Sequence, residues 1–396
     1  MEALVEPAGE PRVGSVRSRL IASALPTLDP LMLLPRKPRT RPPFPLGEPS
    51  AHHVFFARNG IYSLARLWGL AGKEVLFPSY FHGVELDALL EAGVRPRFYP
   101  VDGRMQVDPQ EVISAIGEET AAVYLIHYLG FPGPVEELAA ACEERGVKLI
   151  EDCALALLSS SGERPLGSFG HASIFCLYKT LPVPNGGILV LRQPAALRLP
   201  EGEPPNLAST VGPMASSLLQ RLEISAGHLG WAIRGGIRAV GAAARWHRAG
   251  RHVPTGTQRF DRTHVRLAMS PISRRILDAQ DFARIVESRR RSYFHLLGRL
   301  RSVSPPVFNE LPPGVCPLFY PLQVERKPQV LEALWRRGIE AVDFWRRGHP
   351  RLPWGLFPES DRLRRTIVEI PCHQDLEPTT VDRIADAVIE AMEEAN

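Results

Sequence analysis

The sequence predicts an α/β fold, with a mostly parallel β-sheet covered by helices on both faces and a smaller C-terminal α/β domain. Residues 54–192 alternate between amphipathic stretches of helical period and short apolar runs, which is typical of βαβ units. Beyond Asp281 strand-like and helix-like segments alternate again on a smaller scale. Ligands of such folds lie at the carboxyl ends of the strands, so residues directly after each apolar run are candidates for function.

The chain opens with a proline-rich stretch. Eight prolines fall between Pro26 and Pro49, a density that forbids helix and favours an extended backbone. We therefore expect residues 1–50 to form an arm that wraps a neighbour.

A large domain is expected over residues 51–255. Its expected helices are Ile61–Leu70, Gly83–Glu91, Pro109–Ile116 and Val135–Arg145. Its expected strands are Glu74–Phe77, Arg97–Tyr99, Ala121–Ile126, Lys148–Ile150, Ser173–Leu177 and Ile188–Leu191. A helical insertion at about 200–250 breaks this rhythm. Its apolar, Arg-bearing part, 214–250, either packs against the domain, which we favour, or lies on a membrane surface.

A small C-terminal domain is expected over residues 256–396. Its expected elements are a helix from Asp281 to about Leu300, a strand Leu318–Val324, a helix Pro328–Arg337, a strand Thr366–Ile370 and a helix Thr379–Glu394.

Composition excludes several classes of protein. The 396 residues are 44% hydrophobic and 23% charged, which is typical of a globular protein and not of a disordered or fibrous one. The net charge of +4 is spread along the chain, so we expect no nucleic acid partner. Five scattered cysteines without a C-x-x-C pair indicate a reducing compartment and no metal site. We expect neither a signal peptide nor a membrane span, and hence a cytoplasmic protein.

Lysine is scarce, since only five of the 47 basic residues are lysines and the rest are arginines. Arginine cannot supply a deprotonatable amine, so chemistry that needs one has few candidates. Lys179 ends the apolar run SIFCLY and precedes the Pro/Gly-rich loop TLPVPNGG. This position suits a Schiff-base amine in a sheet crevice, although on position alone a lysine that merely caps a strand edge is the favoured interpretation.

Three further positions have both a functional and a structural interpretation. Asp152 ends a buried-looking strand, where its carboxylate either partners the pyridinium nitrogen of pyridoxal phosphate (PLP) or forms a helix cap or ion pair. Asn59-Gly60 opens a helix and is either a phosphate site or an ordinary turn. His82 follows a strand and either stacks on a flat cofactor or is a plain hydrogen-bonded residue.

Taken together, these motifs resemble those of the DegT/DnrJ/EryC1/StrS family of PLP-dependent sugar aminotransferases, which have the aspartate-aminotransferase fold of type I. The resemblance runs from about Phe56 to Leu191 and resumes near 284–300 and in the tail RRTIVEIPCHQDL. The matching motifs are RNG, EVLFPSYFHG, RPRFYPVDGRMQVDP, YLIHYLGFPGPVEEL, VKLIEDCALAL and GSFGHASIFCLYK. The resemblance implies a large domain with a sheet of the seven-stranded type.

The resemblance also implies roles for individual residues. Lys179 and Asp152 match the catalytic Schiff-base lysine and its pyridinium partner, and His82 falls at the ring-stacking position. The other implied cofactor-binding residues are Asn59, Gly60 and Ile61 on the phosphate turn, Leu155 beside the cofactor, and Cys176 at a phosphate-binding position. Gly186 and Gly187 match the Gly pair after the lysine loop.

Some of these residues depart from the family pattern. Ile61 replaces a Thr, Cys176 replaces a Ser, and Leu155 stands where the family has Gln or His. The segment Thr263–Met269 only loosely echoes the family segment that reaches across the dimer. These losses point to a divergent subgroup in which backbone N–H groups and arginine carry more of the phosphate binding.

The implied activity is a PLP-dependent aminotransferase of nucleotide-sugar metabolism, such as polysaccharide biosynthesis. It would move an amino group from a small-molecule donor, glutamate, to a keto sugar, with homodimeric active sites and no metal. Two alternatives remain: a PLP enzyme acting on a non-sugar substrate, and a catalytically degenerate PLP-fold protein with a binding or regulatory role. The family's dehydratases carry His in place of the lysine, so Lys179 argues against that outcome.

Overall fold

The computed structural model describes residues 19–35, 41–192, 199, 202–245 and 260–395. Its centre is a seven-stranded sheet in the order β1-β9-β8-β5-β4-β2-β3. These strands are β1 (Ala51–Val54), β2 (Glu74–Pro78), β3 (Arg95–Tyr99), β4 (Thr120–Ile126), β5 (Lys148–Asp152), β8 (Ala172–Cys176) and β9 (Gly187–Leu191). The pairs from β3 to β8 are parallel, whereas β9 and β1 add antiparallel partners at one edge. The predicted fold class is confirmed.

Helices between the strands bury the sheet. They are α1 (Ala57–Leu67), α2 (Val84–Glu91), α3 (Pro109–Ala115) and α4 (Val135–Glu144). The central strands are buried along nearly their whole length, as expected for a parallel sheet covered on both faces. Helix α1 packs directly on the sheet, since a Cβ at Gly60 would make ordinary van der Waals contacts with Leu189 (3.4 Å) and Ile174 (3.6 Å).

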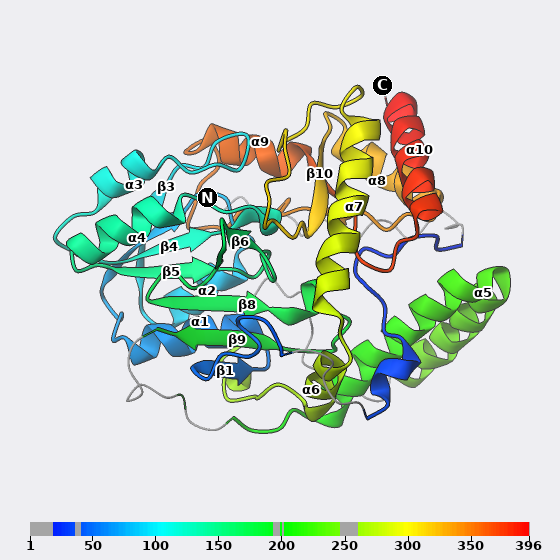
Figure 1. Cartoon of the computed structure of the whole chain (residues 1–396), viewed down its shortest axis with the longest axis horizontal. Helices are drawn as coiled ribbons and strands as arrows, with labels where there is room; N and C mark the ends of the chain where they lie inside the picture. The colour runs from blue at the N-terminus through cyan, green and yellow to red at the C-terminus, as the bar shows by residue number, and fades with distance from the viewer. Residues whose placement is uncertain (1–18, 36–40, 193–198, 200–201, 246–259, 396) are drawn as a thin grey trace, which may run out of the picture.

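The C-terminal part forms a second, smaller α/β layer. Its sheet has the order β10-β12-β11, from β10 (Phe319–Gln323), β12 (Ile367–Pro371) and β11 (Val342–Asp343). Its helices are α7 (Phe282–Leu300), α8 (Lys327–Arg336), α9 (Pro358–Thr366) and α10 (Pro378–Ala395), and α7 and α10 lie side by side (Figure 1). Connecting elements complete the description: the hairpin β6 (Ser160–Ser161) and β7 (Arg164–Pro165), α5 (Leu207–Arg245), α6 (Pro271–Asp278), and the 3-10 turns η1 (Pro30–Leu33), η2 (Tyr128–Gly130), η3 (Leu177–Lys179) and η4 (Arg262–His264).

The described part of the N-terminal arm lies across its own chain. Ala22 forms a parallel bridge with Ile339, and the backbone N–H of Thr27 donates to Asp375. The N–H of Leu28 donates to Ser217 in α5. The arm thus joins α5 to the C-terminal part, while residues 1–18 and 36–40 of its expected length lie outside the described residues.

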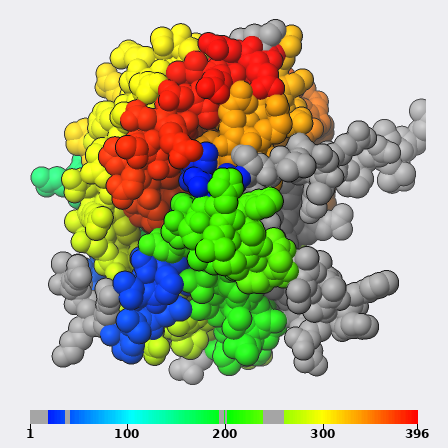
Figure 2. Space-filling view, turned by 90° about the vertical axis from the view of Figure 1, so that its right-hand side faces the viewer, coloured from blue at the N-terminus to red at the C-terminus, as the bar shows by residue number. Residues whose placement is uncertain are grey.

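Helix α5 packs on this arm. Glu223 Oε1 accepts from the Leu20 N–H, and Arg221 pairs with Asp29 at 2.7 Å. The packing that we favoured from the sequence is therefore correct for residues up to Glu223. The chain then reverses at Gly227, where φ is +63° and ψ is −130°. In the space-filling view α5 lies on the outside of the molecule, over the N-terminal segment (Figure 2). No helix in the described chain is long and apolar enough to cross a membrane.

Candidate active site at the carboxyl edge of the large sheet

Strands β2, β4, β5 and β8 run parallel, so their carboxyl ends meet at one edge of the sheet. Asp152 is the last residue of β5, His82 follows β2, and Lys179 follows β8 in the turn η3. The fold therefore gathers at one edge three residues that are up to 97 positions apart in sequence (82 to 179).

Asp152 is 5% exposed, and both its carboxylate oxygens are held. Its Oδ2 accepts a hydrogen bond of 2.6 Å from the Tyr124 hydroxyl, and its Oδ1 accepts one of 2.8 Å from the Ala154 N–H. Burial raises the pKa of Asp152, and the nearby Glu85 carboxylate raises it further. The charge of Lys179 acts in the opposite direction, so a cation stabilises the ionised form of Asp152.

Lys179 is half-buried. Its positive charge acts on the titration of Asp152, Glu85 and His82, so its side chain is near enough to influence all three. Among the described residues, no hydrogen bond or ion pair engages its Nζ within the distance limits for such contacts. The amine thus lies within electrostatic reach of a buried carboxylate, and in the described part of the chain it is not tied to a structural partner.

The His82 side chain is 26% exposed. Burial of the ring, together with the charges of Lys179 and Arg58, lowers the pKa of His82 to about 4. The ring is therefore neutral near pH 7. Trp345, from the C-terminal part, has its ring centroid 6.5 Å away.

Glu85 fixes the backbone that carries His82. Its carboxylate accepts hydrogen bonds from the N–H groups of His82 (2.7 Å) and Gly83 (3.0 Å) at the start of α2. Burial raises the pKa of Glu85, whereas these two N–H donors and the charge of Lys179 lower it. This side chain is a second buried carboxyl next to Asp152.

The predicted phosphate turn lies in the first turn of α1. Arg58 is 8% exposed, and its guanidinium lies 4.1 Å from the Phe56 ring centroid. The Asn59 side-chain amide donates to the backbone oxygen of His264, and Ile61 is 3% exposed within the core. The structure thus supplies a helix N-terminus and a buried guanidinium here, but no hydroxyl from Ile61.

Cys176 is 2% exposed at the end of β8. Burial raises the pKa of its thiol, while the charge of Lys179 and a hydrogen bond with the Tyr178 side chain lower it. The titration of Arg58 depends on the charges of Cys176 and Tyr178, and that of Tyr178 depends on Arg58 and Cys176. These three side chains therefore form a cluster of polar residues close to Lys179. Leu155, at 4% exposure, packs in the hydrophobic core.

The loop after Lys179 is closely packed. A Cβ at Gly187 would lie 2.5 Å from the Ala57 nitrogen, and one at Gly186, where φ is +145°, would lie 2.9 Å from the Met269 sulfur. Both glycines are therefore required by close approach. The segment Thr263–Met269 lies on its own chain here, where the Phe55 N–H donates to the Leu267 oxygen.

The C-terminal part adds a buried carboxyl to the same region. Glu369 on β12 is 3% exposed, and its Oε1 has no hydrogen-bond partner among the described residues. Burial raises the pKa of Glu369 to about 8, although the charges of Lys179 and Lys327 lower it. The Tyr80 hydroxyl is also fully buried and has no hydrogen-bond partner among the described residues. Burial raises the pKa of Tyr80, and the charge of Glu369 acts in the same direction.

His127, Glu151 and Cys153 bring three potential metal ligands together, but the Glu151 carboxylate is already satisfied. It accepts hydrogen bonds from the N–H groups of Gly167, Phe169 and Gly170, and lies 3.1 Å from His127 Nε2. His127 Nδ1 accepts from the Gly133 N–H, so its Nε2 carries the proton and donates it to Glu151. The cluster holds loops together.

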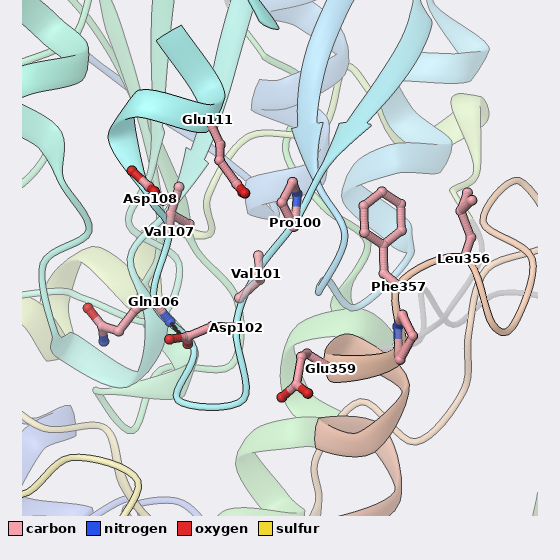
Figure 3. Close-up of a pocket in the computed structure, with 11 residues that line it drawn as sticks. Pro100, Val101, Asp102, Gln106, Val107, Asp108, Glu111, Leu356, Phe357 and Glu359 are labelled. Atoms are coloured by element: carbon pink, nitrogen blue, oxygen red, sulfur yellow. Dashed lines mark hydrogen bonds between the residues drawn. The ribbon is translucent and has the colours of Figure 1, made fainter. Parts of the chain in front are cut away.

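A cavity of about 440 Å³ lies away from this site. Figure 3 shows residues 100–111 facing residues 356–359 across it. Its carboxylates come from Asp102, Asp108, Glu111 and Glu359. Neither Lys179 nor Asp152 lines it, and its acidic lining disfavours a phosphorylated ligand.

The sequence interpretation missed Tyr124, Glu85, Arg58 and Glu369. Two of them had a local signal: Arg58 directly precedes Asn59, and Glu85 follows His82 by three residues, the spacing of a helix capping box. Tyr124 and Glu369 had none, because strand pairing and packing against the C-terminal part bring them to the site.

Comparison with known proteins finds similarity to the family whose motifs this sequence resembles. Residues 61–198 match the sequence profile of the DegT/DnrJ/EryC1/StrS aminotransferase family. The chain is 31% identical over 122 residues to GDP-perosamine synthase of Vibrio cholerae, a match covering 30% of this chain and 33% of that protein. It is 36% identical over 126 residues to dTDP-4-dehydro-2,3,6-trideoxy-D-glucose 4-aminotransferase of Saccharopolyspora spinosa, covering 31% and 33% respectively. The chain thus spans about a third of the length of these curated relatives.

The fold is shared over a longer stretch. Helicobacter pylori PseC, an aminotransferase involved in the biosynthesis of pseudoaminic acid, superposes with a TM-score of 0.64 at 16% identity, covering 96% of this chain and 100% of PseC. Residues 61–198 are therefore similar in sequence to the DegT/DnrJ/EryC1/StrS aminotransferase family, and the chain shares the fold of a solved aminotransferase.

Proposed function

We propose that this protein is a PLP-dependent aminotransferase that moves an amino group to a keto sugar carried on a nucleotide. The observation that carries the proposal is that Lys179, whose Nζ has no hydrogen-bond or ion-pair partner among the described residues, lies at the same edge of the sheet as the buried Asp152 carboxylate. The names of the curated relatives, GDP-perosamine synthase and a dTDP-sugar 4-aminotransferase, support the substrate class.

The residues present suit PLP at both ends. Asp152 would accept a hydrogen bond from the ring nitrogen, because each carboxylate oxygen has a second lone pair beyond the one used by Tyr124 or Ala154. A cationic N–H there also offsets the burial of the Asp152 charge. Arg58 and the N-terminal N–H groups of α1 would hold the phosphate, and the neutral His82 ring would cover the flat face.

Lys179 would carry the cofactor on its amine and yield that position to the amino donor. When bound, PLP withdraws electrons from the donor's α-carbon and so acidifies its α-proton. The released amine of Lys179 is our candidate to remove that proton, while Asp152 keeps a proton on the ring nitrogen. Tyr124 and the Ala154 N–H hold the Asp152 carboxylate in place for this.

We propose glutamate as the amino donor and a homodimer as the working form. The Thr263–Met269 segment lies beside the Lys179 loop and the start of α1, so a partner subunit docked on this face would meet the site directly. We further propose a reducing, cytoplasmic setting, which suits five free and buried cysteines.

The test is a transamination assay with purified protein, PLP, glutamate and GDP- or dTDP-linked 4-keto sugars. We expect an amino sugar nucleotide and 2-oxoglutarate in equal amounts. A protein that binds PLP but transfers no amino group to any keto substrate would instead be the degenerate form that the residues Ile61, Leu155 and Cys176 suggest. Transfer to non-sugar ketones alone would reject the substrate class.

A further inference from the structure

Arg364 of α9 is 1% exposed and reaches from the C-terminal part into the large domain. Its Nη1 donates hydrogen bonds to the backbone oxygens of Phe81 (2.9 Å), Trp345 (3.0 Å) and Arg347 (3.1 Å). Its Nη2 donates to the backbone oxygen of Ser79 at 3.3 Å. Ser79 and Phe81 lie in the loop between β2 and α2, whereas Trp345 and Arg347 follow β11. One guanidinium therefore ties these two loops to α9.

The charge of Arg364 has no acidic partner within ion-pair distance in the part of the chain that the structure describes. Backbone oxygens surround it instead, together with the rings of Tyr80 and Phe81, whose centroids lie 5.3 Å and 5.4 Å from the guanidinium carbon. An apolar side chain of similar volume would fill this space at a lower cost in desolvation. It would not bind several backbone oxygens at once, which the planar fork of N–H donors allows. The geometry of the guanidinium therefore explains its place here.

The two loops that Arg364 binds carry the His82 ring and the ring beside it. Phe81 directly precedes His82, and the Trp345 ring lies at 67° to the His82 ring with 6.5 Å between their centroids. On the other side of His82, the Glu85 carboxylate accepts a hydrogen bond from the His82 N–H. The backbone that carries His82 is thus fixed by Arg364 before the residue and by Glu85 at and after it.

A second buried contact joins α9 to the same loop but does not reach the residues next to His82. The Ser360 hydroxyl, in the first turn of α9, lies 2.7 Å from the Ser79 hydroxyl, and Ser360 is 1% exposed. Ser360 makes this contact without binding the Phe81 or Trp345 oxygen. The two side chains therefore separate the docking of α9 in general from the positioning of His82 in particular.

We propose that Arg364 is a positioning residue that holds the His82 ring where it covers the flat face of PLP. The inference rests on the proposed function, because that function assigns the ring to cofactor binding. Arg364 acts only through the backbone at Phe81 and through the Trp345 loop.

The test is a double-mutant cycle read out as PLP affinity, by equilibrium dialysis at pH 7.5. H82A should weaken binding by about tenfold, and R364M should weaken it by up to about tenfold, the whole contribution of the ring. H82A/R364M should be no weaker than H82A, about tenfold and not about a hundredfold below wild type, because without the ring nothing is left to position. R364K keeps the charge but lacks the fork, so its loss should be smaller than that of R364M.

S360A is the matched control. It removes a buried hydrogen bond between the same two elements and leaves the contacts of Arg364 in place. It should bind PLP as wild type does, even where its melting temperature falls.

Losses that add in H82A/R364M, to about a hundredfold, would overturn the proposal. So would wild-type affinity in R364M, or a loss in S360A as large as that in R364M. Failure of both R364M and R364K to fold, judged from their melting curves, would assign Arg364 a structural role alone and reject the proposal as well. Wild-type protein that binds no PLP would reject the proposed function and this inference with it, whereas additive losses in protein that binds PLP reject only the role of Arg364.

Discussion

Tyr124 on β4 donates its phenolic proton to Oδ2 of Asp152 on β5 across 2.6 Å. The parallel register sets Tyr124 opposite Ile150, and Asp152 lies two residues further along β5, so the two side chains share one face of the sheet. Burial and the Asp152 charge raise the pKa of Tyr124 well above its usual range. The phenol therefore remains protonated, and a donor, at neutral pH.

Removing this donor tests its effect on Asp152. In Tyr124→Phe the pKa of Asp152 should rise further, because the phenol favours the ionised carboxylate. The acid limb of the pH–rate profile should move to higher pH, and the rate should fall roughly ten- to a hundredfold, the value of a hydrogen bond to a charged group. Tyr99→Phe is the matched control, since it loses a buried 2.7 Å bond to the Tyr124 carbonyl and leaves the carboxylate alone. An unmoved acid limb in Tyr124→Phe would show that Asp152 does not depend on the phenol.

His82 should act through its ring and not through a charge. A pKa of about 4 keeps it neutral above pH 5, so His82→Phe should retain PLP affinity within a few-fold. His82→Ala removes the ring and should weaken PLP binding by about tenfold, since an aromatic contact contributes roughly 0.5–1.5 kcal/mol. Equilibrium dialysis at pH 7.5 measures both. Weak binding by the Phe variant, equal to that of the Ala variant, would require a polar role for His82.

Two residues at the expected phosphate site, Cys176 and Ile61, depart from the family pattern, and restoring a hydroxyl at each should increase the affinity for PLP. Cys176→Ser and Ile61→Thr each add a hydroxyl, a better donor than a thiol or an alkyl group, and each should tighten PLP binding by about 1 kcal/mol, or a few-fold. The two effects should add only if the hydroxyls meet separate phosphate oxygens. Dialysis is paired with the melting temperature of each apo-protein. Weaker binding together with a lower melting temperature would mean that these buried positions, 2% and 3% exposed, do not face the phosphate.

The raised pKa of Glu369 predicts that the free energy of unfolding depends on pH. Its folded pKa of about 8 lies above the ordinary value of 4.5, so the folded protein holds a proton that the unfolded chain releases between these values. The contribution of Glu369 to the free energy of unfolding is therefore fully present below pH 4.5 and declines as the pH rises to 8. Each pKa unit corresponds to about 1.36 kcal/mol, so the change is on the order of a few kcal/mol.

Glu369→Gln removes this titration. Its free energy of unfolding should match that of wild type near pH 5 and exceed it near pH 9, as measured by urea denaturation. The exposed Glu325→Gln serves as control and should track wild type at both values. A constant difference between Glu369→Gln and wild type across this range would contradict the raised pKa.

Local pattern predicted much of the fold, and the limits of such prediction are visible in particular elements. The run predicted at Ala121–Ile126 became β4, since its apolar, β-branched residues suit a strand buried on both faces. The strand β1 (Ala51–Val54) was missed, because AHHV has no run of apolar residues and is held by pairing with β9. The helix α9 was missed because its sequence PESDRLRRT is polar, and Arg364 anchors it through backbone oxygens of Phe81 and Trp345.

The candidate site shows the same division. Lys179 and Asp152 were found because each ends an apolar run, and in a parallel sheet all such ends meet. Glu369 was not found, since its run IVEIP reads as an ordinary strand of the C-terminal part and no local pattern tells which layer Glu369 faces. The reversal in α5 also escaped prediction, because a glycine within a helical pattern is compatible with an unbroken helix.

The central claim is that Lys179 carries the cofactor. The measurement is borohydride reduction of the PLP-loaded protein, followed by peptide mapping of the labelled lysine. The label should lie on Lys179, and Lys179→Ala should lose both the label and the visible absorption of the bound cofactor. Lys148→Ala, at the opposite end of neighbouring β5, should keep both. A label on Lys73, Lys148 or Lys327, or an undiminished absorption band in Lys179→Ala, would contradict the account.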